Sequence, residues 1–409
     1  MKDDKNTVNR IMPVQKAKKK QTMGFDKTAE HLICLVSCAL GGTEAKAVLP
    51  DEVDLAGLFV FAKKHSVAAM VCMVLEKTDA FDKAEPAVKK QWLDAKNKAI
   101  RKNMLLDADC HILTDEMERA GIWHMPLKGS ILKDWYPQYG MREMSDIDIL
   151  FDETKRSQVK EIFLQHDYSF QKPHVANHDV YFKPPIYNFE MHTSLIDEKD
   201  SIEHAAKYRK VVNKLIPDEN KKYRLNFTPE DFYVFALTHA YKHYSHKGTG
   251  IRTLADIYVM NRKIGPSMDW VYVNRELKSL GIEAFEKNSR ELAEKIFGAT
   301  PVSEIMLTAE ERVMLQYYMR AGAYGSFESD INKSLRSLQA DTEPITGFTK
   351  IKYCMSRLFP GREWCKNKYP FVYRHPYLLP FFWIWRCFKK LPMSRKRIKK
   401  EISAIKSSK

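Results

Sequence analysis

No run of about 20 apolar residues, the length that a helix needs to cross a bilayer, occurs in the sequence. The most apolar segment, residues 377–388, has twelve residues and is interrupted by Pro380 and Arg386. It therefore predicts no membrane span. Two interpretations stay open: a C-terminal element that packs its aromatic rings onto the body of the protein, which we favour, and an interfacial anchor in which the rings enter the headgroup layer.

The sequence also lacks an even number of cysteines and any CxxC motif. The chain has seven cysteines, an odd number, and none of them forms a CxxC motif or follows a secretory signal. Cys34 and Cys38 lie one helical turn apart in an apolar run, where free cysteine usually behaves as a small buried hydrophobic residue. These features predict a reducing, cytoplasmic location and argue against a disulfide framework.

Net positive charge is scarce outside the two ends of the chain. Residues 1–20 hold seven Lys or Arg and two Asp, and residues 389–409 hold nine Lys or Arg and Glu401. The tails thus carry five and eight of the fifteen net positive charges, which leaves about two on residues 21–388. Solvated tails explain this pattern most simply. Weak contact of the tails with nucleic acid or with an anionic membrane, which would make the protein peripheral to that membrane, is the alternative.

The sequence also lacks internal repeats and heptad arrays. Because a chain of 409 residues exceeds the size at which a single hydrophobic core stops growing, two or three folded domains are expected. Helical periodicity dominates before residue 120 and after residue 203, and it changes between them. The predicted segments are a disordered basic lead-in (1–24), an N-terminal helical region (25–120), a catalytic α/β domain (121–198), a C-terminal helical domain (199–345), and an aromatic, proline-rich segment with a basic tail (346–409).

The central segment alternates in the manner of a small sheet. Strands are expected at 122–127, 147–151, 168–171, 179–182 and 188–195, with a helix at 153–166. This order of elements predicts an α+β fold, in which a small mixed sheet stands between two flanking helical regions.

The sequence Ser-Asp-Ile-Asp-Ile-Leu at 145–150 carries two acids that point to the same side of a strand, because side chains alternate between its faces. Asp146 and Asp148 held in this way repel each other unless a cation lies between them. Mg²⁺, which prefers oxygen ligands, would remove the repulsion. A solvated strand end or a helix cap is the alternative interpretation of this motif.

Two further motifs flank this pair. Gly129 and Ser130 follow a predicted strand and open a helix, where backbone amides and the Ser130 hydroxyl can meet phosphate oxygens. Glu190 and His192 share the polar face of a later strand. A simple turn at 129–130 and an ordinary surface Glu190 are the alternatives. For His239 and His243, one turn apart on a predicted helix, we favour packing or substrate contact over metal binding.

In this order, the motifs resemble the DNA polymerase beta-type nucleotidyltransferase superfamily: Gly-Ser opening a helix, then acid-x-acid on a strand, then one acid on a later strand. More closely, the chain from about residue 28 resembles the bacterial uncharacterised nucleotidyltransferase family. The segments that carry this resemblance are 125–137, 140–150, 190–192, 228–231, 252–256, 358–360 and 377–383, with His239 and His243. The interval from Gly-Ser to the first acid is longer than in the minimal superfamily pattern, and the extra residues would form a loop beside the nucleotide.

The resemblance implies a metal-dependent enzyme that transfers a nucleoside monophosphate from a nucleoside triphosphate to a hydroxyl acceptor. Asp146, Asp148 and Glu190 would hold two Mg²⁺ or Mn²⁺ ions and act in catalysis. Lys128, Gly129, Ser130 and Arg142 would bind the nucleotide, with a surface Lys128 and a structural Arg142 as the alternatives for those two residues. The acceptor, whether a protein, a tRNA or a small molecule, is not readable from the sequence. A non-catalytic nucleotide-binding regulatory module, or a protein that docks on RNA or membrane through its basic tails, is the alternative.

Overall fold

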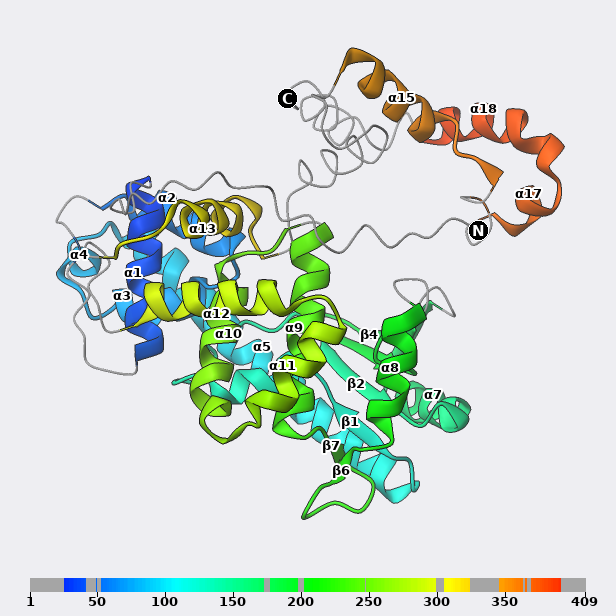
Figure 1. Ribbon diagram of the computed structural model, residues 1–409, viewed down its shortest axis with the longest axis horizontal. Helices are drawn as coiled ribbons and strands as arrows, with labels where there is room; N and C mark the ends of the chain where they lie inside the picture. The colour runs from blue at the N-terminus through cyan, green and yellow to red at the C-terminus, as the bar shows by residue number, and fades with distance from the viewer. Residues whose placement is uncertain are drawn as a thin grey trace. The chain divides into compact units, whose positions relative to one another are not determined.

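The computed structural model describes residues 26–41, 49, 53–172, 177–197, 202–246, 248–298, 305–323, 346–362, 365 and 369–390 (Figure 1). The chain divides into two compact units, residues 1–242 with 249–323 and residues 243–248 with 324–409. The lead-in at 1–24 and the tail beyond 390 lie outside the described residues. The finer division into five segments stays a prediction.

Helices begin the first unit, as the periodicity predicts. Asp54 caps one of them by accepting a hydrogen bond from the Gly57 amide (2.8 Å), and Pro86 occupies the first turn of another, where its missing N–H costs nothing. The five helices are α1 (Lys27–Gly41), α2 (Leu55–Lys64), α3 (Ala68–Leu75), α4 (Asp79–Asp82) and α5 (Pro86–Arg119).

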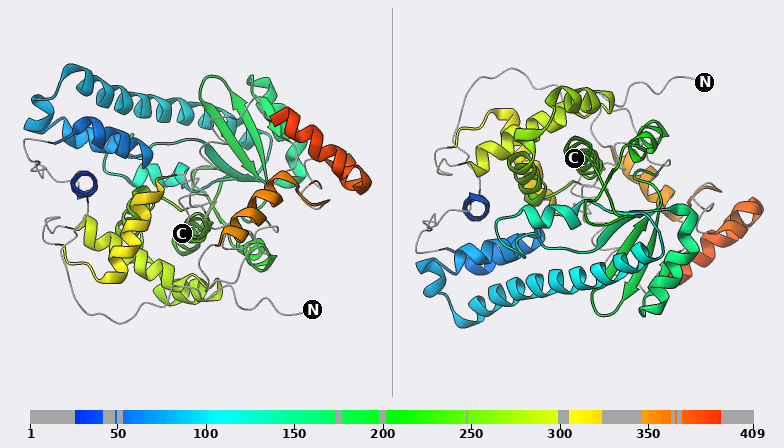
Figure 2. Two further views of the ribbon diagram at one scale, coloured as in Figure 1. Left: turned by 90° about the horizontal axis from the view of Figure 1, so that it is seen from above. Right: turned by 90° about the horizontal axis from the view of Figure 1, so that it is seen from below.

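The helix α5 connects the N-terminal helices to the sheet (Figure 2). Its 34 residues extend about 51 Å at about 1.5 Å per residue. Near its start Trp92 is fully buried and donates from its indole N–H to the Leu55 carbonyl (3.1 Å). It ends before Gly121, whose φ of +68° suits glycine and turns the chain toward the first strand.

A mixed five-stranded sheet follows, with the strand order β1-β2-β5-β4-β3. The neighbours β2 and β5 are parallel, and the other neighbouring pairs are antiparallel. This confirms the predicted α+β fold. The strands are β1 (His124–Pro126), β2 (Ile147–Phe151), β3 (Ser169–Lys172), β4 (His178–Lys183) and β5 (Tyr187–His192); the intervening helices are α6 (Gly129–Leu132), η1 (Lys133–Trp135), η2 (Glu153–Lys155) and α7 (Arg156–Gln165).

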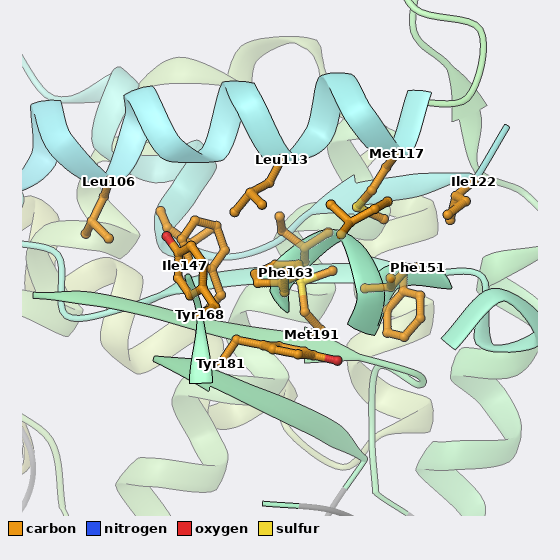
Figure 3. Packing of buried hydrophobic residues seen from close by; sticks show 14 of the residues in the cluster. Leu106, Leu113, Met117, Ile122, Ile147, Phe151, Phe163, Tyr168, Tyr181 and Met191 are labelled. Carbon is orange, nitrogen blue, oxygen red and sulfur yellow. The ribbon is translucent and has the colours of Figure 1, made fainter. Parts of the chain in front are cut away.

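One face of the sheet forms the core of this region. Leu106, Leu113 and Met117 point from α5 toward the sheet, as Figure 3 shows. Phe163 from α7 stacks on Tyr181 with ring centroids 4.3 Å apart. Fully burying each side chain of this kind stabilises the fold by about 1.5–3 kcal/mol. Because residues alternate along each strand, filling this face with apolar side chains leaves the opposite face to the polar ones.

The chain then returns to helices. A two-stranded sheet precedes most of them, formed by β6 (Ile216–Pro217) and β7 (Leu225–Asn226). The helical elements are α8 (Ile202–Val212), α9 (Pro229–His246), α10 (Ile251–Lys263), η3 (Gly265–Ser267), α11 (Trp270–Ser279), α12 (Glu283–Phe297) and α13 (Ala309–Ala321).

The described part of the second unit is also helical, although its sequence shows no clear period. It contains α15 (Gly347–Leu358), α17 (Pro370–Arg374), η5 (Pro376–Leu378) and α18 (Leu379–Lys390). Pro370, Pro376 and Pro380 obscure the periodicity but lie in the first turns of these elements, where proline is tolerated. In the described residues, no helix combines the length and apolar character that crossing a membrane requires.

Candidate active site

The three predicted acids lie together on the polar side of the sheet. In the parallel pairing of β2 with β5, Asp148 is the direct partner of Glu190, so the two carboxylates project side by side. Asp146 immediately precedes β2, two residues before Asp148, and accepts a hydrogen bond from the Ser145 hydroxyl (2.8 Å). The alternation predicted from sequence thus places the acids on one face, with Phe189 and Met191 in the core.

The three carboxylates respond differently to this shared environment. Burial, together with the nearby charges of Asp148 and Asp146, raises the pKa of Glu190 to about 7. Burial and the charge of Asp148 also raise the pKa of Asp146. Burial opposes ionisation of Asp148 as well, but Lys128 and His192 outweigh it and lower the pKa of that carboxyl. Without a bound cation, the site therefore disfavours ionisation of Glu190 and Asp146 and favours ionisation of Asp148.

Lys128 and His192 both contact Asp148. Lys128 Nζ lies 2.8 Å from Asp148 Oδ1, and His192 Nε2 lies 2.8 Å from the same oxygen. Both nitrogens donate, because an ionised carboxylate only accepts hydrogen bonds. Lys128 also has a φ of +48°, which is unusual for a residue with a side chain, so the turn holds it in a strained conformation. The predicted contact of Lys128 with a phosphate stays a prediction.

The turn from β1 to α6 leaves the Ser130 hydroxyl without a partner. Its Oγ is buried and has no hydrogen-bond partner in the described part of the protein. The amides of Ser130 and Ile131 instead donate within the turn, to the carbonyls of Leu127 and Lys128. The amides that were predicted to donate to phosphate are therefore largely occupied by hydrogen bonds within the turn. The Ser130 hydroxyl remains as the polar group to which a ligand can form a hydrogen bond.

Gly129 is close to protein atoms rather than to an open space. A Cβ at this position would lie 2.5 Å from Arg142 Nη1 and 3.0 Å from Met144 Cε. Glycine therefore lets Arg142 cross directly over the turn. The expected nucleotide contact of Gly129 stays a prediction, and the structure adds packing as a reason for glycine here.

Arg142 has a different partner from the predicted phosphate. Its Nε and Nη2 donate to the two carboxylate oxygens of Asp256 on α10, at 2.8 and 3.1 Å. The Tyr136 hydroxyl donates to the same carboxylate (2.7 Å). Asp256 lies in the segment 252–256 that carries the family resemblance, but its pairing with Arg142, 114 residues away, was not predicted from the sequence. The predicted phosphate contact of Arg142 stays a prediction, and it would compete with this ion pair.

The long interval between Gly129 and Asp146 forms a loop that several helices hold. The Ala69 amide at the start of α3 donates to the Glu143 carboxylate (3.1 Å), and the Asn103 amide group of α5 donates to the Arg142 carbonyl (3.0 Å). Lys102 of α5 donates to the Ser145 carbonyl (2.9 Å). The loop therefore connects the acids to the N-terminal helices and, through Asp256, to α10.

His178 completes the polar face and was not identified from the sequence. It pairs with His192 across the antiparallel strands β4 and β5, and their ring centroids are 5.0 Å apart. Burial lowers the pKa of both imidazoles, so both are neutral near pH 7. Counting back from the turn between Lys183 and Tyr187 would have found the pair, because the strands are in register.

The residues of this face suit a divalent metal ion. Asp146, Asp148 and Glu190 offer the carboxylate oxygens that Mg²⁺ prefers. The raised pKa of Glu190 also indicates a carboxylate that a nearby cation would stabilise in its ionised form. These two observations, one geometric and one electrostatic, fit the metal that the sequence motifs imply.

We expect metal binding at this site to release protons in a pH-dependent way. A ligand carboxylate must be ionised, and Glu190, with a pKa of about 7, is mostly protonated at pH 6 in the metal-free protein. Mg²⁺ binding should therefore release about one proton from Glu190 near pH 6 and almost none near pH 8. Calorimetry in buffers of different ionisation enthalpy measures this release. It should disappear in Glu190→Gln, and equal release at the two pH values in the wild type would contradict the expectation.

The fold and the site together define the class of protein. A mixed sheet carries Gly-Ser after one strand, two alternating acids at the next and a third acid on a later, adjacent strand, in the order in which the sequence motifs place them. A family model described as "Uncharacterised nucleotidyltransferase" matches residues 51–298, more than half of the chain. The chain belongs to this family. No curated protein and no solved structure matches it.

Membership of this family makes the protein a transferase of nucleotidyl groups with a nucleoside triphosphate as substrate. The matched residues include every predicted site residue, from Lys128 to Glu190, and the Arg142–Asp256 pair. The predicted resemblance to the uncharacterised nucleotidyltransferase family is therefore confirmed over residues 51–298, while its extension to the C-terminal segments and the bacterial origin stay predictions.

Proposed function

We propose that the protein transfers a nucleoside monophosphate from a triphosphate to a hydroxyl acceptor, with Asp146, Asp148 and Glu190 as the catalytic residues. The pairing of Asp148 with Glu190 across β2 and β5 carries this proposal, because it brings acids from distant segments to one place. In the reaction, the acceptor oxygen bonds to the α-phosphorus and the bond from that phosphorus to the pyrophosphate breaks. Glu190, whose pKa lies near neutrality, takes the hydroxyl proton.

Asp146, Asp148 and Glu190 would hold two Mg²⁺ or Mn²⁺ ions, which supply positive charge opposite the entering and leaving oxygens. Lys128 is placed to move from Asp148 to the triphosphate once a cation neutralises that carboxylate. The Ser130 hydroxyl would donate to a phosphate oxygen. Arg142 would shape this region by fixing the loop to α10 through Asp256.

Incubation of the full chain with each labelled triphosphate, Mg²⁺ or Mn²⁺ and fractionated cell extract tests the proposal, with pyrophosphate release as the readout. Label should pass to a component of one fraction. Tight triphosphate binding without product in every fraction would instead favour the non-catalytic, nucleotide-binding alternative.

Ser130→Ala should raise the KM for the triphosphate by about tenfold. A hydrogen bond to a charged group contributes about 1.5–3 kcal/mol, and the buried hydroxyl has no other partner to lose in the described part of the protein. Steady-state kinetics with varied triphosphate measures the change. Ser267→Ala, which removes an exposed hydroxyl bonded to the Ile264 carbonyl, is the control and should leave KM unchanged. An unchanged KM in Ser130→Ala would remove this residue from the nucleotide site.

We also propose that the second unit docks on an anionic membrane through α18. Tyr377, Phe381, Ile384 and Trp385 are exposed, with 46–71% of their surfaces accessible, and the last three share one helix face. The other face is held within the unit, where Trp383 donates to the Pro360 carbonyl (3.1 Å). The sequence from 389 to 409 adds nine basic residues and one acid, which favours an anionic surface.

Replacing Phe381 and Trp385 by serine should lower partitioning onto vesicles of phosphatidylcholine and phosphatidylserine by at least about tenfold, because each ring contributes about 1.5–3 kcal/mol when buried. Sedimentation with the vesicles measures it. Val271→Ser, at an 80% exposed position on α11, is the control. Equal partitioning of the double variant and the wild type would contradict membrane docking, as would binding to RNA alone.

A further inference from the structure

Two histidines flank Glu190 on the polar face of the sheet. Glu190 Oε2 lies 3.7 Å from His178 Nε2 and 3.8 Å from His192 Nε2. His178 and His192 are direct backbone partners on β4 and β5, and Glu190 stands two residues before His192 on the same strand face. The three groups therefore come from two hydrogen-bonded strands, which hold them in a rigid relation.

The spacing of these atoms fits the ligands of one metal ion. With metal–ligand distances of about 2.1 Å, two ligands of one ion lie about 3.0–4.2 Å apart, depending on the angle between them. The ligand atoms of the three residues all lie within 4.8 Å of one another, and both distances from Glu190 fall inside the expected interval. Small side-chain adjustments would complete the site.

Each of the two imidazoles also has a second nitrogen that is buried. The His192 side chain is 6% exposed, and its Nδ1 is buried with no hydrogen-bond partner among the described residues. The Nδ1 of His178 is buried and unpartnered in the same sense. These Nδ1 atoms are not the nitrogens that lie near Glu190, so the spacing of the Nε2 atoms, rather than the unpartnered atoms, carries the inference of a ligand.

From this geometry we infer that His178, Glu190 and His192 bind a divalent transition-metal ion. Two imidazole nitrogens with one carboxylate oxygen suit Zn²⁺, Mn²⁺ or Fe²⁺ better than Mg²⁺, which prefers oxygen ligands alone. The site shares Glu190 with the proposed catalytic acids, but binding of the ion does not depend on the transfer reaction. The face would thus offer an oxygen-rich position at Asp146 and Asp148 and a nitrogen-containing position beside it.

Binding at this position would change the contacts of Asp148. In the structure the His192 Nε2–H donates to Asp148 Oδ1 (2.8 Å). If the ion binds Nε2, the hydrogen leaves that nitrogen and Asp148 loses this donor, while Lys128 still contacts it. In the described part of the protein His178 contacts Glu190 and makes no hydrogen bond to Asp148, so a change at His178 probes the ion without removing a hydrogen bond from that carboxylate.

The experiment is a titration of the full chain with Zn²⁺ alone and with Mg²⁺ alone by calorimetry, with Co²⁺ absorption as a spectroscopic signature of nitrogen ligands. Zn²⁺ should bind with one ion per chain, and His178→Gln should weaken it by about 100-fold, since even partners of metal ligands contribute about 10–100-fold to affinity. Mg²⁺ affinity should stay within about twofold in this variant, because its oxygen ligands are intact.

Controls separate this inference from the proposed reaction. His166→Gln removes an imidazole that contacts Glu116 on α5, outside the cluster, and should leave Zn²⁺ affinity unchanged. Asp146→Asn should strongly lower the rate of transfer yet keep Zn²⁺ binding, so the two proposals can fail independently. His192→Gln is a second test of the site and should also weaken Zn²⁺ binding. Circular dichroism checks that each variant folds, and if His192→Gln does not fold, the result for His178→Gln decides. Wild-type Zn²⁺ affinity in folded His178→Gln would overturn the inference.

Discussion

Replacing Asp146 and Asp148 together by asparagine should lower the rate of pyrophosphate release by about 10³–10⁴-fold. Metal ions supply several kcal/mol of charge stabilisation in reactions of this kind, and each 1.36 kcal/mol corresponds to about tenfold in rate. The two acids share one face of the sheet, and Asp148 lies beside Glu190. Initial rates with the preferred triphosphate and its acceptor fraction measure the effect.

The single variants help to interpret that result. Asp146→Asn removes a carboxylate whose pKa is raised by burial and by Asp148, so it should not weaken the fold. Asp148→Asn instead takes the partner from Lys128, so its stability must be checked. Asp152→Asn, which alters an N-cap just beyond β2, is the matched control. Turnover equal to the wild type in the double variant would disprove the assignment of the acids.

The second large effect is expected on stability, at Asp256. Its carboxylate accepts two hydrogen bonds from Arg142 and one from Tyr136, and the side chains of the Arg142–Asp256 pair are 10% and 15% exposed. Removing one partner of a buried ion pair leaves an uncompensated charge, which costs about 3–5 kcal/mol. Asp256→Ala should therefore lower the free energy of unfolding by about this amount, as measured by urea denaturation.

An exposed ion pair provides the comparison. Arg119 lies 3.9 Å from Glu116, three residues earlier on α5, and its side chain is 73% exposed. Arg119→Ala should change the free energy of unfolding by less than about 0.5 kcal/mol, because solvent screens such pairs. Similar losses in the two variants would mean that the Arg142–Asp256 pair has no special role in holding the loop.

Local patterns predicted that the three acids lie on one face of the sheet, while their catalytic role stays a proposal. Alternation along a strand depends only on neighbouring residues, so Asp146, Asp148 and Glu190 were placed on a polar face from sequence alone. Which strands are neighbours depends on contacts between distant segments. The position of β5 between β2 and β4 brings Glu190 beside Asp148. Local patterns could not predict this position, and only the structure shows it.

The missed features have the same physical origin. His178 gains its role through its register with His192, which only the hairpin turn between them indicates, and Asp256 gains its role through a partner 114 residues away. In α15, α17 and α18 the reason is different. Prolines in first turns and exposed apolar residues such as Phe381 obscure the helical period on which the prediction depended.

The hairpin of β4 and β5 carries the residues of the site near one end and an exposed turn at the other end. Six backbone pairs hold it in register, from His178 with His192 to Lys183 with Tyr187, and the turn beyond carries the exposed residues Pro184 and Pro185. At about 3.3 Å per residue, the turn lies roughly 17–20 Å from the histidines. A fluorophore attached there would move with the same rigid hairpin as Glu190 and His192. It would therefore serve as a fixed reference for energy-transfer measurements that locate a labelled acceptor when it binds.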